Sequence, residues 1–305
     1  MNIKPKPFLK WAGGKTQLLN DIEAKFPYSR NDKFTYVEPF VGSGAVLFWI
    51  LNNFPNLKSV IINDINEDLT DSYKTIKSNV TDLILVLQKY ENEYHSLSER
   101  AEEKKEYYYE KRKLFNMRES EQTIQSALFI FLNRTCFNGL YRVNQKNEYN
   151  VPIGSYKKPM ICDESNLLAV HKSLQNVEIL SGDFEQTINY ANEDTVFYFD
   201  PPYKPLSKTS SFNSYAKNEF NDNEQIRLKE FCDKIDSFSC KLILSNSDVK
   251  GKNPNDNFFD DLFYGYQIDR VMAKRSINAN PNKRGQLTEL LISNQGVCNA
   301  VCINL

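Results

Sequence analysis

The chain has little glycine, almost no histidine and no paired cysteines. Of its 305 residues, 11 are glycine and two are histidine. Its six cysteines, at positions 136, 162, 232, 240, 298 and 302, form no Cys-x-x-Cys pair. Zinc sites need clustered Cys and His ligands, so we expect no metal. The cysteines are expected to be reduced thiols, buried as small apolar side chains.

Long apolar runs are also lacking. The longest uncharged ones, such as Ala127–Leu132, are far too short to cross a bilayer. The N-terminal residues Met1-Asn-Ile-Lys-Pro contain no apolar signal core. We therefore expect a cytoplasmic protein with no membrane partner. With 41% hydrophobic residues, the chain suits one large domain or a core that carries an insertion.

The net charge of −1 hides two basic stretches. Residues 130–158 contain five Lys or Arg and one acid, and residues 269–286 contain five more and one acid. Such patches on a neutral protein suit a polyanion bound at one face. On charge alone, two solvated loops explain them better.

The order of apolar segments predicts an α/β fold. We expect strands at Phe34–Val37, Ser59–Ile62, Val177–Leu180, Thr195–Phe199, Lys241–Leu244, Gln267–Val271 and Leu287–Ser293, with a helix at Ala45–Asn52. Residues 68–172 interrupt this alternation of expected strands and helices. They are helical in pattern up to about Leu132, and Tyr141–Val151 could form two short strands around Gln145–Asn147. The expected division is a core of residues 1–67 and 173–305 with an insertion at 68–172.

Polar groups follow several of the expected strands. They are Gly42 and Gly44 in the turn Phe40-Val-Gly-Ser-Gly44, then Asp64 and Asp183. Ligands of open α/β sheets bind at such strand ends. The glycines permit close approach of a ligand, Asp64 could bind ribose hydroxyls, and Asp183 could accept a hydrogen bond from an adenine amine. A structural turn and helix N-caps are the alternatives.

The segment Trp11-Ala-Gly-Gly-Lys15-Thr16 resembles the end of a P-loop. A P-loop needs a glycine five positions before Gly14, after a strand. That position is Leu9, and no strand precedes it. We therefore set the triphosphatase reading aside. Lys15 could instead meet a ligand carboxylate, with Trp11 stacked beside it.

The sharpest signal is Asp200-Pro201-Pro202-Tyr203, directly after an aromatic strand. The prolines have fixed φ and no N–H, so they hold an extended turn. Asp200 and the Pro201 carbonyl then form two rigid acceptors beside the flat face of Tyr203. Two acceptors favour a pyramidal, nucleophilic exocyclic amine, and the ring can hold a base flipped out of a duplex. The tetrapeptide predicts methylation of an exocyclic amine; a rigid loop with a capping Asp is the alternative.

The chain resembles the Dam-type DNA adenine methyltransferases. The resemblance rests on ordered matches along most of the sequence: Pro7–Lys15, Glu38–Gly44, Asn63–Asn66, Asn133-Arg134, Phe137–Arg142, Glu148–Pro152, Gly182–Phe184, Asp200–Tyr203 and Arg275–Ile277. It implies a Rossmann-like, S-adenosylmethionine-dependent methyltransferase core with an inserted helical and β-hairpin domain that recognises DNA. The hairpin would span about residues 136–156.

The resemblance also implies roles for individual residues. S-adenosylmethionine would be bound by Trp11, Lys15, Phe40, Gly42, Gly44, Asp64, Asp183 and Asp200, and catalysis would lie with Asp200, Pro201, Pro202 and Tyr203. Phe137 and Asn138 would enter the space near the flipped base, although tyrosine is more often found at the first position. Arg142 would read a guanine, Leu140 and Pro152 would make apolar base contacts, and Lys10 would touch the first base pair. Arg134, Asn144, Asn150, Tyr156 and Lys157 would contact phosphates.

Family members with such a hairpin commonly methylate GATC, so the resemblance implies GATC as target. Arginine can bind guanine bidentately, which agrees with this reading. The basic stretch 130–158 is then better explained as a phosphate-binding arm. Double-stranded DNA is the expected partner of a monomer associated with the nucleoid; whether a cognate restriction endonuclease acts on the same site is left open.

Three alternatives remain from the sequence. The amine could be N4 of cytosine, since Asp-Pro-Pro-Tyr could serve it too. The chain could bind DNA without turnover, although its acceptors and cofactor motif are intact. A nuclease is weaker still, because we find no convincing carboxylate cluster for a metal. The loop 249–257 and the tail 296–305 match nothing that we can place.

Overall fold

The fold is a mostly parallel sheet with helices on both faces. We describe a computed structural model over residues 3–11, 13–97, 100–204, 220–274 and 286–294. Its strands are β1 (Thr35–Glu38), β2 (Ser59–Ile62), β3 (Val177–Ile179), β4 (Thr195–Phe199), β5 (Lys241–Ser247), β6 (Gln267–Lys274) and β7 (Gln286–Ser293). The order across the sheet is β3-β2-β1-β4-β5-β7-β6, and only β7 pairs antiparallel, with β5 and β6. The predicted α/β fold class is confirmed.

The chain order reverses between β1 and β4. From β1 the chain proceeds to β2 and β3 on one side, and from β4 to β5 on the other. Ligands of open α/β sheets bind outside the carboxyl ends of the strands at such a switch point. The glycine turn (Phe40–Gly44) follows β1, and the segment Asp200–Lys204, the Asp200 loop, follows β4. The topology therefore brings these two motifs together.

Both faces of the sheet are buried. Alternate residues of β4, such as Phe197 and Tyr198, belong to the hydrophobic clusters on opposite faces. All five residues of β4 are buried, as expected for a central parallel strand. The helices α1 (Leu19–Lys25), α2 (Ala45–Asn53), α7 (Asp222–Asp236) and α8 (Phe258–Leu262) accompany the sheet. Asn221 caps α7 by accepting hydrogen bonds from the backbone N–H groups of Asn223 and Glu224.

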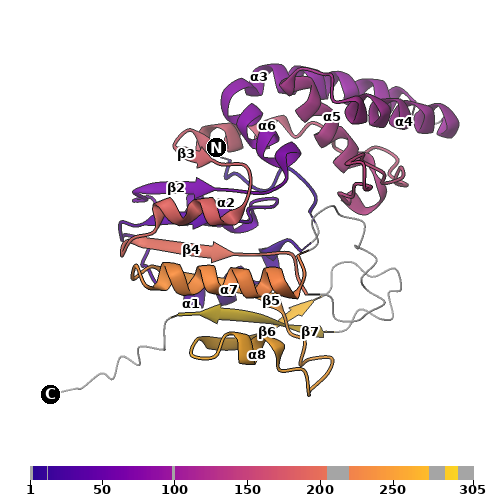
Figure 1. Ribbon diagram of the computed structural model, residues 1–305. Helices are drawn as coiled ribbons and strands as arrows, with labels where there is room; N and C mark the ends of the chain where they lie inside the picture. The colour runs from indigo at the N-terminus through magenta and orange to yellow at the C-terminus, as the bar shows by residue number, and fades with distance from the viewer. Residues whose placement is uncertain (1–2, 12, 98–99, 205–219, 275–285, 295–305) are drawn as a thin grey trace.

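Between β2 and β3 the described chain is helical and adds no strand to the sheet. It forms α3 (Glu67–Ser96), α4 (Ala101–Met117), α5 (Gln122–Thr135) and α6 (Glu164–Leu174). Figure 1 shows these helices gathered at the β3 edge, with β6 and β7 at the opposite edge. Their buried faces share one hydrophobic cluster with a face of the sheet; Leu132 and Val60 are both members. The helical segment is therefore packed firmly on the core.

Two sequence expectations needed correction. The polar run Ser245-Asn246-Ser247 was expected to follow the fifth strand, but β5 continues through it because its residues pair with β7. The segment 141–151 was expected to contain two short strands. It forms a hairpin with only two isolated bridges, Cys136 with Ile153 and Val143 with Tyr149. Its backbone is held instead by turn hydrogen bonds and by side chains.

Candidate functional site

The Asp200 loop begins at the carboxyl end of β4 and meets Lys15. Lys15 Nζ lies 3.0 Å from Oδ1 of Asp200 and donates to the Gly13 carbonyl at 2.7 Å. The lysine side chain is only 4% exposed, whereas that of Asp200 is 23% exposed. Burial raises the pKa of Asp200 to about 6, against the opposing effect of the Lys15 ammonium. Lys15 thus pairs with a carboxylate of the protein itself.

Tyr203 is held by a residue that the sequence reading did not identify. Its hydroxyl donates to Oε2 of Glu289 on β7, 2.7 Å away. Lys15 Nζ lies 4.4 Å from the centre of the Tyr203 ring and 3.8 Å from Glu289. One available signal was the charge itself, since Glu289 is the only charged residue in the strand segment Leu287–Ile292. Four side chains from three distant segments therefore form one cluster.

The glycine turn after β1 is held closely by its neighbours. Gly42 and Gly44 have φ of +49° and +77°, in the left-handed region that favours glycine. The Gly42 N–H donates to Oδ2 of Asp64 at 3.0 Å, and its carbonyl accepts from the Tyr73 hydroxyl at 3.1 Å. A Cβ on Gly44 would lie 2.6 Å from that hydroxyl. The turn therefore requires glycine at both positions.

Asp64 joins the glycine turn to the start of α3. Besides the Gly42 N–H, its carboxylate accepts from the Asn66 N–H at 3.0 Å. Burial raises its pKa, and these backbone N–H groups oppose the rise. The N-cap of α3 is Asn66 rather than Asp64. Asp64 is thus a fixed acceptor at the end of β2.

Asp183 carries the cap that the sequence reading left open, and an ion pair besides. Its side chain accepts from the Glu185 N–H at the start of a 3-10 helix (Phe184–Tyr190). Arg227 of α7 binds both carboxylate oxygens, at 3.2 and 2.7 Å. Partial burial raises the pKa of Asp183, but the guanidinium and the N–H group lower it below its ordinary value. Phe40 packs nearby, with its ring centre 5.3 Å from that of Phe184.

Trp11 connects the glycine turn to the hairpin. Its ring stacks on Tyr141 with centres 5.7 Å apart and an interplanar angle of 21°. A Cβ on Gly42 would lie 3.2 Å from the indole. The Tyr141 hydroxyl in turn donates to Asp68 at 2.9 Å. Trp11 therefore touches both the strand-end site and the hairpin.

The extended N-terminal segment is bound to the helices by side chains. Asn133 of α5 accepts from the Lys10 N–H and donates to the Lys10 carbonyl, both at 2.8 Å. Asn166 of α6 makes the same pair of bonds with Lys6, both at 3.0 Å. Between them, Arg134 donates to the Phe8 carbonyl at 2.7 Å. Burial lowers the pKa of Arg134. Because its guanidinium bonds the Phe8 carbonyl, this predicted phosphate contact also supports the N-terminal segment.

The hairpin presents Arg142 on its surface. Arg142 is exposed and its Nε donates to Oδ1 of Asn150 at 2.7 Å. Asn144 shapes the tip, because its side chain accepts from the N–H groups of Lys146 and Glu148 and donates to the Glu148 carboxylate. Glu148 at the tip, when ionised, can only accept hydrogen bonds. Among the exposed side chains of the hairpin, the Arg142 guanidinium therefore offers the most hydrogen-bond donors.

The remaining predicted contacts lie at the base of the hairpin. Phe137 is 50% exposed, and Asn138 is exposed with φ of +55°. Lys10 Nζ lies 3.8 Å from the centre of the Tyr156 ring. Pro152 and Lys157 are exposed and Leu140 is partly buried. The hairpin thus carries aromatic, apolar and cationic groups together with exposed amides. The matched residues Arg275–Ile277 lie outside the described part of the chain.

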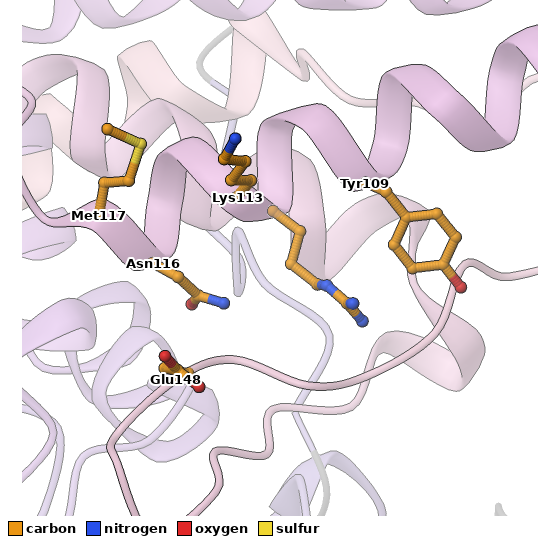
Figure 2. A pocket seen from close by; sticks show the side chains of 6 residues that line it. Tyr109, Lys113, Asn116, Met117 and Glu148 are labelled. Carbon is orange, nitrogen blue, oxygen red and sulfur yellow. The ribbon is translucent and has the colours of Figure 1, made fainter.

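A hollow lies between the hairpin and α4. Figure 2 shows Tyr109, Lys113, Asn116 and Met117 along the helix, with Glu148 of the hairpin tip on the other side. The Asn116 amide pairs with both backbone groups of Tyr149, at 2.8 and 3.0 Å. The Asn116 side chain on α4 therefore makes hydrogen bonds to the hairpin backbone that a neighbouring strand would otherwise make. These bonds hold the hairpin although it has few bridges of its own.

Comparisons with known proteins identify the family. The family model described as "D12 class N6 adenine-specific DNA methyltransferase" matches residues 11–277. The chain belongs to this family. It is thus an adenine-specific DNA methyltransferase rather than an N4-cytosine enzyme, a nuclease or a binding protein without turnover.

Curated relatives cover nearly the whole chain. It is 51% identical to the type II methyltransferase M.MjaIII of Methanocaldococcus jannaschii, over 96% of this chain and 100% of that protein. It is 38% identical to a DNA adenine methylase of Haemophilus influenzae, over 95% and 93% of the two chains. It is 35% identical to the type II methyltransferase M1.LlaDCHI of Lactococcus lactis subsp. cremoris, over 96% and 97%.

No group of three or more His, Cys, Asp or Glu side chains in the described ranges could hold a metal ion. None of the helices described is long and apolar enough to cross a membrane.

Proposed function

We propose that this enzyme transfers a methyl group from S-adenosylmethionine to N6 of adenine in double-stranded DNA, within GATC. The observation that carries the proposal is the cluster at the switch point, where Asp200 and Tyr203 meet Lys15 beside the glycine turn. An ionised carboxylate next to an aromatic face is the arrangement that an exocyclic amine requires.

The residues at the strand ends fit S-adenosylmethionine. The turn presents backbone without side chains at Gly42 and Gly44, Asp64 offers a fixed carboxylate, and Phe40 provides an apolar face. We propose that these residues hold the cofactor together with Trp11 and Gly42. Lys15, Asp183 and Asp200 complete the set. When bound, S-adenosylmethionine would supply the methyl group of its sulfonium and leave as S-adenosylhomocysteine, and the methylated amine would then lose one proton.

The Asp200 loop prepares the amine for the reaction. Asp200 and the Pro201 carbonyl accept its two hydrogens, which favours a pyramidal nitrogen with a free electron pair. Pro202 stiffens the turn, and Tyr203 stacks on the adenine after it has flipped out of the duplex. This arrangement needs no covalent enzyme intermediate, because positioning and electrostatics supply the rate enhancement.

The inserted segment 68–172 serves as the target-recognition domain, and residues 1–67 and 173–305 form the catalytic core. Arg142 reads a guanine, which fits its exposed guanidinium on the hairpin. Phe137, Asn138, Leu140, Pro152 and Lys10 contact bases, and Asn144, Asn150, Tyr156, Lys157 and Arg134 contact phosphates. The type II names of two relatives favour a restriction endonuclease of the same specificity as partner. We propose that the enzyme acts as a monomer on nucleoid DNA.

Mapping modified bases on a plasmid tests the proposal. Unmethylated plasmid is incubated with the protein and S-adenosylmethionine, and N6-methyladenine is located by sequencing. We expect methylation at every GATC and none with Asp200→Ala, which should still bind the cofactor through the other residues of the set. Modification of another sequence would refute the GATC assignment alone. Full activity of Asp200→Ala would refute the catalytic assignment.

A further inference from the structure

Three buried polar side chains lie behind the Asp200 loop and have no part in the scheme above. Gln225 of α7 is 1% exposed, and Asn246 and Ser247 of β5 are 0% and 5% exposed. Burial of a polar side chain is unfavourable unless its hydrogen-bonding groups are paired. The positions of their partners therefore indicate what these side chains do.

Their hydrogen bonds lead to the backbone of the loop. Gln225 Nε2 donates to the Pro202 carbonyl at 3.2 Å, and Ser247 Oγ donates to the Lys204 carbonyl at 2.9 Å. Asn246 Nδ2 donates to Oε1 of Gln225 at 3.0 Å, which orients the glutamine amide with its NH₂ toward the loop. The chain of bonds thus runs from β5 through α7 to Pro202.

The two prolines explain why the loop depends on donors from elsewhere. Neither Pro201 nor Pro202 has an N–H, so this part of the loop can be held only through its carbonyls. Because the ring of Pro202 fixes its φ, only ψ of Pro202 can vary between the Pro202 and Pro201 carbonyls. Holding the Pro202 carbonyl therefore limits the direction of the Pro201 carbonyl, the proposed acceptor for the target amine.

The Tyr203 side chain is fixed from the other side. Glu289 accepts from its hydroxyl at 2.7 Å, so the residues on either side of the Pro202–Tyr203 peptide bond are held by α7 and β7. Ser247, at the carboxyl end of β5, holds the next residue. Three separate elements therefore converge on three consecutive residues.

We propose that Gln225 is a positioning residue for methyl transfer, that Asn246 orients it and that Ser247 holds the adjoining Lys204: together they aim the Pro201 carbonyl and Tyr203 at the target amine. This inference rests on the proposed role of the Asp200 loop. Gln225 touches neither the base nor the cofactor. Its effect is on the rate of the chemical step, where small displacements of reacting groups are costly.

The test compares Gln225→Met with a matched control. Methionine keeps the length of the side chain but removes both the donor to Pro202 and the acceptor for Asn246. Gln125 is the control, since its Nε2 donates to the Phe115 carbonyl at 2.9 Å, between α5 and α4. Gln125→Met removes the same kind of bond away from the loop. Ser247→Ala is a third, smaller change that removes only the bond to Lys204.

Single-turnover methylation is measured on a duplex carrying the site mapped for the wild type, with cofactor affinity, DNA affinity and melting temperature. For Gln225→Met we expect a rate lower by about 10- to 100-fold with both affinities within about twofold of wild type. Ser247→Ala should lower the rate by about two- to tenfold. Gln125→Met should lower the melting temperature and leave the rate unchanged.

The outcomes separate this inference from the proposed function. If the wild type methylates DNA and the folded Gln225→Met does so at the same rate, the positioning role is refuted. A rate loss matched by equal losses of cofactor or DNA affinity also refutes it, because that pattern indicates a general loss of structure. Absence of methyl transfer by the wild type would instead refute the proposed function.

Discussion

Lys15 Nζ lies 3.0 Å from Oδ1 of Asp200, and the same ammonium lies 4.4 Å from the centre of the Tyr203 ring. The lysine is almost fully buried, so its charge acts on the carboxylate with little screening by water. Burial raises the pKa of Asp200 to about 6, and Lys15 limits that rise. Burial and a residue from the other end of the chain thus act in opposite directions on the ionisation of the proposed catalytic carboxylate.

The pH dependence of catalysis follows from this pair. Protonated Asp200 loses its charge and one acceptor, so kcat should fall as the pH drops through about 6. Lys15→Gln removes the group that lowers the pKa, and the acid limb should then move to higher pH. A pH profile of kcat at saturating substrates measures both. Lys25→Gln, which breaks a surface pair with Asp269, is the control. An unshifted limb in Lys15→Gln would contradict the coupling.

The contact between Tyr203 and Glu289 predicts a graded series. Tyr203→Phe keeps the ring and loses one hydrogen bond, so kcat should fall by about two- to tenfold. Tyr203→Ala also loses stacking on the base, worth about 1–3 kcal/mol. Glu289→Ala should lower kcat at least as much as Tyr203→Phe, because it also removes a partner of Lys15. The double variant should be no worse than Glu289→Ala, because both single changes remove the same hydrogen bond. Additive losses in the double variant would show that the two residues act separately.

The two asparagines on the N-terminal segment form a matched pair. Asn133→Ala leaves both backbone groups of Lys10 and the Gly139 carbonyl without their partner, and Asn166→Ala leaves both backbone groups of Lys6 without theirs. Each should cost about 1–3 kcal/mol of unfolding free energy, measured by denaturant titration. Only Asn133→Ala should weaken DNA binding, because it alone releases Lys10. Equal DNA affinities for the two variants would argue against a role of Lys10 at the DNA.

Arg142 and Lys157 should have different effects on DNA binding. Arg142→Ala should cost about 1–3 kcal/mol at one guanine and relax the preference there. Lys157→Ala should weaken binding to all sequences alike and reduce the slope of log affinity against log salt by about 1. Binding to duplexes with single base changes, at several salt concentrations, distinguishes them. Unchanged sequence preference in Arg142→Ala would contradict the assignment of Arg142 as the residue that reads a guanine.

Much of the fold could be read from the chain because its signals are local. The apolar run Thr195–Phe199 is β4 to the residue, and Ser59–Ile62 is β2. The end of β5 could not be read, because Ser245–Ser247 are polar and become strand only by pairing with β7. The hairpin was expected as paired strands, whereas Asn116 of α4 supplies part of its hydrogen bonding.

The sequence by itself determined the motifs: an Asp-Pro-Pro-Tyr turn after a buried strand, a glycine turn after another, and the order that places them in one family. Those features depend on neighbouring residues and on backbone geometry. The tertiary structure decided the partners. It pairs Lys15 with Asp200, Glu289 with Tyr203, and Gln225 with the Pro202 carbonyl. These contacts join segments far apart in the chain, and no local preference encodes them, since only the packed sheet brings β4, β5, β7 and α7 to one place.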